Sequence, residues 1–171
     1  SLYTEEVSLE RLAAIVPEGL AQHWRDSLEF LSIITSEWPS ILAAQELMDP
    51  AARRVALIDL QSARWVQQPP QHPVIIAGTT GSTPAVARMM RVVSNLPAGA
   101  VVLPGLDLAA PAEVWDSIDE PHPQSGLKAL LASLETSIEH VRCWPGSAET
   151  GENSRADLIS VALRPADASD G

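Results

Sequence analysis

The middle of the chain alternates apolar and polar blocks in the order expected for one β-α-β unit. A run of β-branched residues at 74–76 is typical of a strand buried on both faces of a parallel sheet. A glycine-containing loop, residues 78–83, follows it, and Pro84 stands where the first position of a helix tolerates proline. Residues 101–103 predict a second strand. The apolar face of the intervening helix consists of Val86, Met89, Met90 and Val93.

The first third of the chain has helical periodicity. A short amphipathic turn is expected near residues 8–16, and a longer helix from Pro17 until Trp38-Pro39 breaks it. Ile41, Leu42 and Leu47 suggest a further short helix. Asp49-Pro50 is a strong start signal for the next helix, which should run to about Gln67. The expected apolar faces are Leu20, Trp24, Leu28, Leu31 and Ile34 for one helix, and Val55, Ile58, Ser62 and Trp65 for the other.

Further elements are expected after the β-α-β unit. Residues 112–118 predict a short helix, and residues 120–124 form a proline-broken loop. An amphipathic helix should then present Leu127, Leu130, Leu131 and Leu134. Residues 141–144 are a candidate third strand, and a last helix should begin at Ser154, after a polar segment at 146–153.

These elements predict an α/β fold in two parts, a helical part at residues 1–68 and a small parallel-sheet part at residues 69–171. The chain has 171 residues, 46% of them hydrophobic, which is enough for one sizeable core. The single Cys143 excludes a disulfide framework and favours a reducing compartment. No segment resembles a signal peptide or a membrane span, so we expect a cytoplasmic protein without a membrane partner.

The net charge limits the partners that this chain can bind by itself. Eleven basic against 22 acidic residues give a formal charge of -11, the wrong sign for neutralising phosphates. DNA binding by this chain alone is therefore disfavoured. A DNA-handling complex remains compatible with the charge, because other domains or a partner can line the DNA channel.

The loop GTTGST, which comprises Gly78, Thr79, Thr80, Gly81, Ser82 and Thr83, allows two interpretations. It lies between a strand and a helix, where α/β folds bind phosphates and nucleotides. However, it lacks the lysine of the phosphate-binding loop GxxxxGK[ST] and does not match GxGxxG. The alternative is a tight turn in which the two glycines allow close packing and Ser82 or Thr83 caps the helix.

The sequence spells out neither a catalytic nor a metal site. Ser82 is not in a GxSxG elbow, and no motif links it to a histidine and a carboxylate, so no catalytic residue is assigned. No pair of histidine or cysteine residues has the spacing of metal ligands, so no metal site is assigned. The histidines are His23, His72, His122 and His140.

Four polar residues after the second predicted strand are candidates for structural or DNA-path contacts. Asp107 follows the strand at the sheet edge where α/β folds assemble sites, and it could bind a metal or cap the next turn. His122 and Gln124 flank Pro123 and can hydrogen-bond to neighbouring loops, which favours a structural lock over catalysis. Lys128 lies on the polar side of the helix that follows.

Two motifs carry a family resemblance. The first motif is VVLPGLD at residues 101–107, and the second is HPQSGLK at residues 122–128. Together with the preceding strand, GTTGSTPA and helix, they resemble the helicase-like region of AddB-type subunits. These belong to the alphaproteobacterial AddAB helicase-nucleases, which repair double-strand breaks. The match covers about residues 49–144. The family's subunit is much longer, so the resemblance implies an excised piece, truncated at its C-terminal end.

The resemblance implies a non-catalytic, helicase-like scaffold with a degenerate P-loop-helicase fold that takes part in DNA end processing. The implied partner is the AddA-type subunit, whose motor uses ATP and magnesium, and DNA is reached through the complex. The family's iron-sulfur cluster lies in a downstream nuclease domain, so no cofactor is expected in this chain. Two alternatives remain, a free-standing small α/β nucleotide-binding protein or hydrolase that uses GTTGST, and an acidic module that binds a protein partner.

Overall fold

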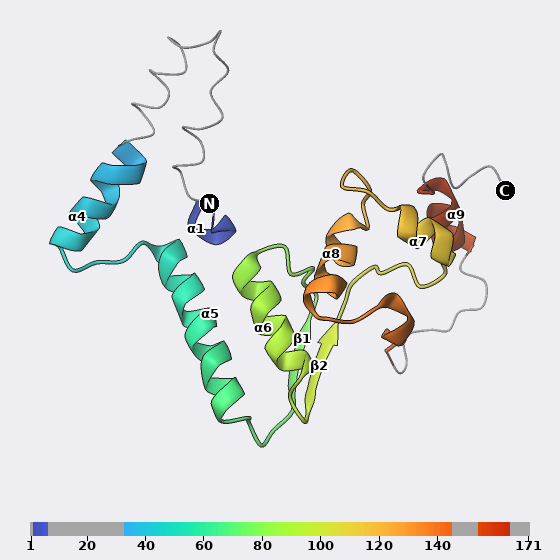
Figure 1. Ribbon diagram of the computed structural model, residues 1–171, viewed down its shortest axis with the longest axis horizontal. Helices are drawn as coiled ribbons and strands as arrows, with labels where there is room; N and C mark the ends of the chain where they lie inside the picture. The colour runs from blue at the N-terminus through green and yellow to red at the C-terminus, as the bar shows by residue number, and fades with distance from the viewer. Residues whose placement is uncertain (1, 7–32, 145–153, 165–171) are drawn as a thin grey trace, which may run out of the picture. The chain divides into compact units, whose positions relative to one another are not determined.

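The computed structural model describes residues 2–6, 33–144 and 154–164 (Figure 1). The helices predicted at residues 8–16 and from Pro17, the polar segment at 146–153 and the tail from residue 165 lie outside this part, apart from the last residues of the second helix. In chain order the elements are α1 (Leu2–Glu5), the π-helical turn η1 (Ile33–Glu37), α4 (Trp38–Ala44), α5 (Pro50–Gln67), β1 (Val74–Ala77), α6 (Pro84–Ser94), β2 (Gly99–Val102), α7 (Ala112–Ser117), α8 (Ser125–Ser133), the 3-10 turn η2 (Ile138–His140) and α9 (Ser154–Ala162).

Residue contacts divide the chain into two compact units. The first contains Ser1–Ala63 with Thr83–Ala85, and the second contains Arg64–Ser82 with Val86–Gly171. The division falls inside α5, whereas the sequence suggested a boundary between residues 68 and 69 at the end of that helix. The boundary at residue 68 stays a prediction.

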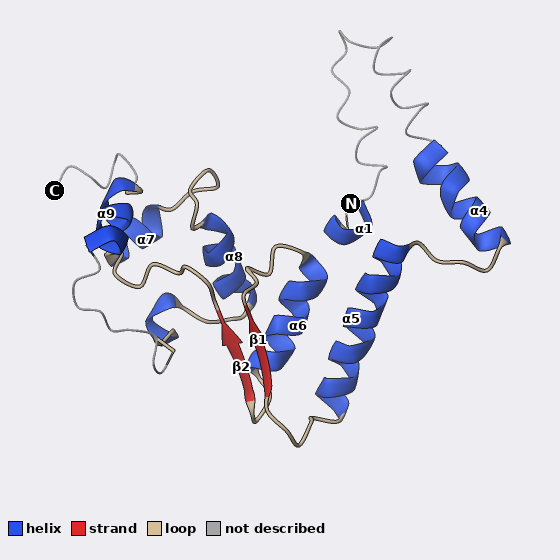
Figure 2. Cartoon of the chain, turned by 180° about the vertical axis from the view of Figure 1, so that it is seen from behind, coloured by secondary structure: helices blue, strands red, loops and turns tan. Residues whose placement is uncertain are grey.

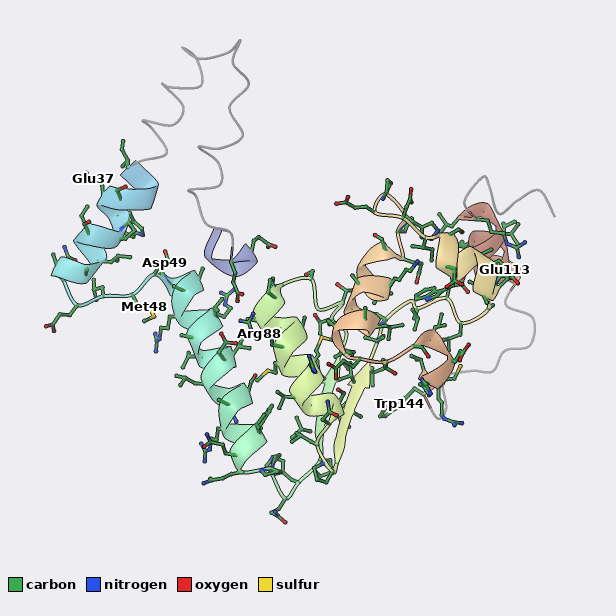
Figure 3. The ribbon with its side chains drawn as sticks, in the orientation of Figure 1. Glu37, Met48, Asp49, Arg88, Glu113 and Trp144 are labelled. Atoms are coloured by element: carbon green, nitrogen blue, oxygen red, sulfur yellow. The ribbon has the colours of Figure 1, made fainter. Side chains whose placement is uncertain are left out.

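In the first unit, α5 begins where the Asp49-Pro50 signal predicted (Figure 3). The Asp49 Oδ1 atom accepts hydrogen bonds from the backbone N–H of Ala51 at 2.7 Å and of Ala52 at 3.3 Å, which caps the first turn. Trp38-Pro39 was expected to break a helix. Instead α4 starts at Trp38, because a proline in the first turn removes an amide that needs no helical partner.

The predicted β-α-β unit is confirmed in the second unit (Figure 2). β1 and β2 pair in parallel, with Val74 opposite Gly99 and Ala77 opposite Val102. The prediction that the first strand is buried on both faces is wrong, since the Ile75 side chain is 53% exposed. Side chains alternate along a strand, and only the Ile76 side packs on the helical core.

The predicted third strand at residues 141–144 is also wrong. In the described residues the sheet has two strands, β1 and β2. The turn η2 ends when the backbone N–H of Val141 donates to the Ile138 carbonyl at 3.0 Å. Val141 is extended, with φ -81° and ψ 133°, but it pairs with no neighbouring strand. The residue types of this segment favour an extended backbone. An extended segment becomes a strand only when it bonds to the edge of a neighbouring strand, and this segment does not.

The core of the second unit lies between the sheet and the helices α6, α7 and α8. Met90 and Val93 of α6 are fully buried, as the predicted helical face required. Two clusters form this core, the first by Met90, Leu127, Leu130 and Leu134, and the second by Trp115, Ile118 and Leu131. The architecture is therefore a mixed α/β fold around a small parallel sheet, which confirms the predicted class at that level.

Candidate functional site

The segment after β2 turns sharply at the carboxyl end of the sheet. Gly105 has φ +67°, in the left-handed region that favours glycine. The Asp107 Oδ1 atom accepts a hydrogen bond from the backbone N–H of Ala109 at 3.0 Å. Of the two roles considered for Asp107, the structure therefore places it in the turn-capping role.

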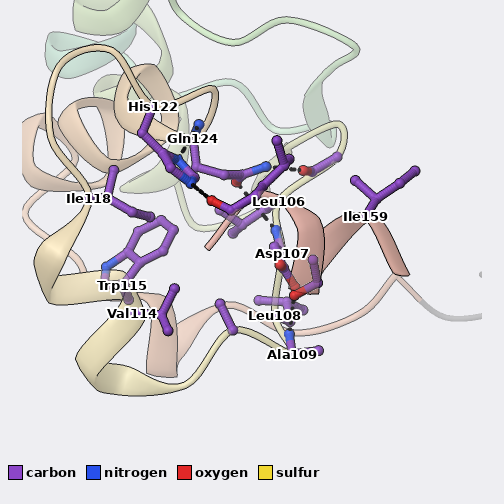
Figure 4. Close-up of a pocket in the computed structure, with 14 residues that line it drawn as sticks. Leu106, Asp107, Leu108, Ala109, Val114, Trp115, Ile118, His122, Gln124 and Ile159 are labelled. Carbon is purple, nitrogen blue, oxygen red and sulfur yellow. Dashed lines mark hydrogen bonds between the residues drawn. The ribbon is translucent and has the colours of Figure 1, made fainter. Parts of the chain in front are cut away.

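The Gln124 side chain joins the two motifs that carry the family resemblance. Its Nε2 donates to the Gly105 carbonyl at 2.9 Å, and its Oε1 accepts from the backbone N–H of Asp107 at 3.4 Å (Figure 4). Both the NH2 group and the carbonyl oxygen of the Gln124 amide are therefore bonded to the loop at residues 105–107. The HPQ step holds the VVLPGLD loop in place, although these residues lie 17 and 19 positions apart in the chain.

The His122 ring connects the Gln124 side chain to Leu163, the residue that directly follows α9. Its Nδ1 accepts a hydrogen bond from the backbone N–H of Gln124 at 3.1 Å. The remaining ring nitrogen, Nε2, lies 2.7 Å from the Leu163 carbonyl oxygen. An accepting Nδ1 places the ring proton on Nε2, so the ring donates to Leu163. Both ring nitrogens therefore hold backbone groups.

Lys128 holds the end of α7. Its Nζ donates to the carbonyl of Asp116 at 2.9 Å and to that of Ile118 at 3.1 Å. These carbonyls lie at the C-terminal end of the helix, where the helix dipole and the unpaired oxygens favour a cation. The ammonium group is therefore engaged in a cap, and not directed to an open phosphate-binding surface.

A cavity of about 350 Å³ lies beside the Gln124 lock (Figure 4). Asp107, His122 and Gln124 line it, but residues 78–83 do not. Its other walls come from the segment after β2, from α7 and from α9, including Leu106, Leu108, Val114, Trp115, Ile118, Ile159 and Leu163. No local sequence pattern indicates that Trp115 and Leu163 line the same cavity, because only long-range packing brings α9 there.

The chemistry of this cavity is that of an apolar pocket with few polar groups. Its polar side chains are Asp107, His122, Gln124 and Ser160, and the first three already bond to backbone groups of the cavity walls. Within residues 2–6, 33–144 and 154–164 no three histidine, cysteine, aspartate or glutamate side chains gather as metal ligands. The arrangement can receive apolar groups.

The GTTGST loop is packed against the core. Gly78 and Gly81 have φ +76° and +62°. A Cβ atom on Gly81 would lie 2.7 Å from Leu130 Cδ1 and 3.1 Å from Met90 Sδ, so the loop approaches α8 as closely as glycine allows. The Gly81 N–H donates to Thr79 Oγ1 at 3.3 Å. The Gly81 N–H is therefore already engaged, and Pro84 has no N–H at all. Neither of these two backbone positions can donate a hydrogen bond to an anion.

Replacing Gln124 with alanine is expected to lower the free energy of unfolding by about 1 to 2 kcal/mol, because Gly105 and Asp107 lose their partner. Urea unfolding followed by circular dichroism measures this. The matched control Gln68→Ala changes an exposed glutamine and should stay within about 0.5 kcal/mol of wild type. Equal effects of the two changes would show that the amide lock contributes no stability.

The comparisons with known proteins identify no relative. No protein-family model matches the chain, and neither a curated protein nor a solved structure matches it. Among the helices that the structure describes, none combines the length and the apolar character needed to cross a membrane.

Proposed function

We propose that the chain is a non-catalytic, helicase-like scaffold of an AddB-type subunit, acting in DNA double-strand-break repair. One observation carries this proposal. VVLPGLD and HPQSGLK, whose order suggested the family, are bonded to each other through Gln124 at 2.9 and 3.4 Å. Motifs that form one structural lock explain why both occur together at this spacing.

The local fold supports a degenerate relative of P-loop helicases. A parallel β-α-β unit with a glycine loop between strand and helix is the arrangement in which such proteins bind nucleotides. In this chain the loop has no lysine, and Gly81 packs against Leu130. A β-α-β unit whose loop lacks this lysine supports the proposal of a scaffold.

The partners in this proposal follow from the same reasoning. An AddA-type subunit supplies the motor with its ATP and magnesium, and an iron-sulfur nuclease domain lies outside this chain. With a formal charge of -11, the chain contributes an acidic outer surface, and other parts of the complex hold the DNA. Lys128 caps α7, which is consistent with a structural role.

The isolated chain is expected neither to hydrolyse ATP nor to bind DNA tightly at physiological salt. Phosphate release and fluorescence anisotropy with labelled single- and double-stranded DNA measure these activities. ATP turnover that is abolished by Thr83→Ala or Asp107→Asn would contradict the scaffold and favour a free-standing nucleotide-binding enzyme. Submicromolar DNA binding that weakens steeply with salt would show a basic surface that the net charge conceals.

A further inference from the structure

The outer edge of β2 carries unpaired backbone groups. The backbone N–H of Val74 donates to the Ala98 carbonyl at 3.0 Å, and Ile76 stands opposite Val101. This register determines which backbone groups of β2 face β1. Hydrogen bonds to β1 come from Ala98, Ala100 and Val102, so the N–H and C=O of Val101 point away from β1. In the part of the chain described, no strand pairs with β2 on that side.

A groove of about 710 Å³ lies along this edge. Strand β2, helix α8 and the segment at residues 136–142 all contribute to it. That segment includes Val141, which is extended but unpaired. The groove thus offers an open strand edge together with the partly exposed apolar side chains of Val101, Leu103 and Val141. Leu131 and Leu134 also line it, but both are buried in the core.

We propose that this groove binds an extended segment of a partner protein, which adds to the sheet as a third strand beside β2. The N–H and C=O of Val101 supply backbone hydrogen bonds, and the side chains of Leu103 and Val141 contact alternate residues of the segment. A two-stranded sheet has little stability by itself, so a third strand also stabilises β1 and β2. This proposal is independent of the scaffold function.

Charge determines which segment fits. Arg142 lines the groove, its side chain is exposed, and it forms no ion pair among the residues described. Glu135, the acidic residue of the groove, is already paired with Arg91. His140, which also lines the groove, already has a hydrogen-bond partner, because its Nδ1 atom lies 3.0 Å from Ser137 Oγ. The groove therefore presents an unpaired cation, which favours a segment that alternates apolar residues with carboxylates.

A second copy of this chain is a poorer occupant than a different protein. Two copies would each carry a formal charge of -11 and repel one another. The partner must then supply the acidic segment on a surface that is not itself strongly acidic.

The test uses the full 171-residue chain and a fluorescent peptide of alternating valine and glutamate. Two further peptides carry N-methyl groups, one on the odd and one on the even backbone amides. Because a strand bonds to its neighbour through every second residue, one methylated peptide should bind about tenfold more weakly and the other within about twofold of the parent. Fluorescence anisotropy measures the three affinities.

Changing the protein provides the second arm of the test. Arg142→Gln should weaken binding of the peptide about threefold at low salt, whereas Arg54→Gln, at another exposed arginine, should not. No binding of the parent peptide, or an equal loss with both methylated peptides, would overturn the proposal. Self-association of the chain that protects the Val101 amide from hydrogen exchange would overturn the assignment to a different protein.

Discussion

Replacing Trp115 with alanine is expected to lower the free energy of unfolding by about 3 to 5 kcal/mol. The Trp115 side chain is 9% exposed and packs with Ile118 and Leu131 in the second core cluster. Its removal leaves a cavity beside the site, and the loss is a large part of the stability of an ordinary domain. Urea unfolding followed by far-ultraviolet circular dichroism measures the change.

The matched control for this prediction is Trp144→Ala, which removes the same side chain at a position that is 49% exposed (Figure 3). We expect a loss of about 1 kcal/mol or less there. Trp115→Phe should retain a good part of the wild-type stability, because the ring still fills most of the volume. A loss of similar size at Trp115 and Trp144 would contradict the position of Trp115 in the core.

Replacing Gly81 with alanine is expected to destabilise the chain by about 2 to 4 kcal/mol. The new Cβ would lie 2.7 Å from Leu130 Cδ1, and the backbone at φ +62° disfavours any side chain. Gly78→Ala is the matched control, since Gly78 has φ +76° but nothing within 4 Å of its Cβ position.

The control isolates close packing from backbone strain. Gly78→Ala should cost about 1 to 2 kcal/mol, from the left-handed backbone alone. The difference between the two variants, measured by the same urea unfolding, then reports how tightly GTTGST packs on α8. If both variants lose equal stability, the loop is not held against Leu130, and an open anion-binding loop becomes the better interpretation.

Much of the secondary structure could be predicted because its signals are local. Asp49-Pro50 marks the start of α5 through a side-chain cap, and Pro84 marks the start of α6. The start of α9 at Ser154 was also predicted correctly. The third strand at residues 141–144 was not, because an extended backbone becomes a strand only when a neighbouring edge is within hydrogen-bonding reach.

The candidate site was predictable only in part. The polar residues of the motifs, Asp107, His122 and Gln124, stood out in the sequence, and the structure brings them to one cavity. The side of the cavity that contains Ile159 and Leu163 could not be predicted, because the His122 contact with Leu163 joins residues 41 positions apart. Nor does any local pattern indicate that the open edge of β2 lies along a groove.

We propose that the chain is a scaffold that works with a separate motor subunit. The most direct measurement is sedimentation velocity of the chain mixed with a purified alphaproteobacterial AddA-type subunit, with each protein alone as reference. We expect a faster-sedimenting complex that contains both proteins, in which ATP hydrolysis depends on the AddA-type subunit. Independent sedimentation of the two proteins, together with ATP turnover by the chain alone, would show that the chain is not such a scaffold.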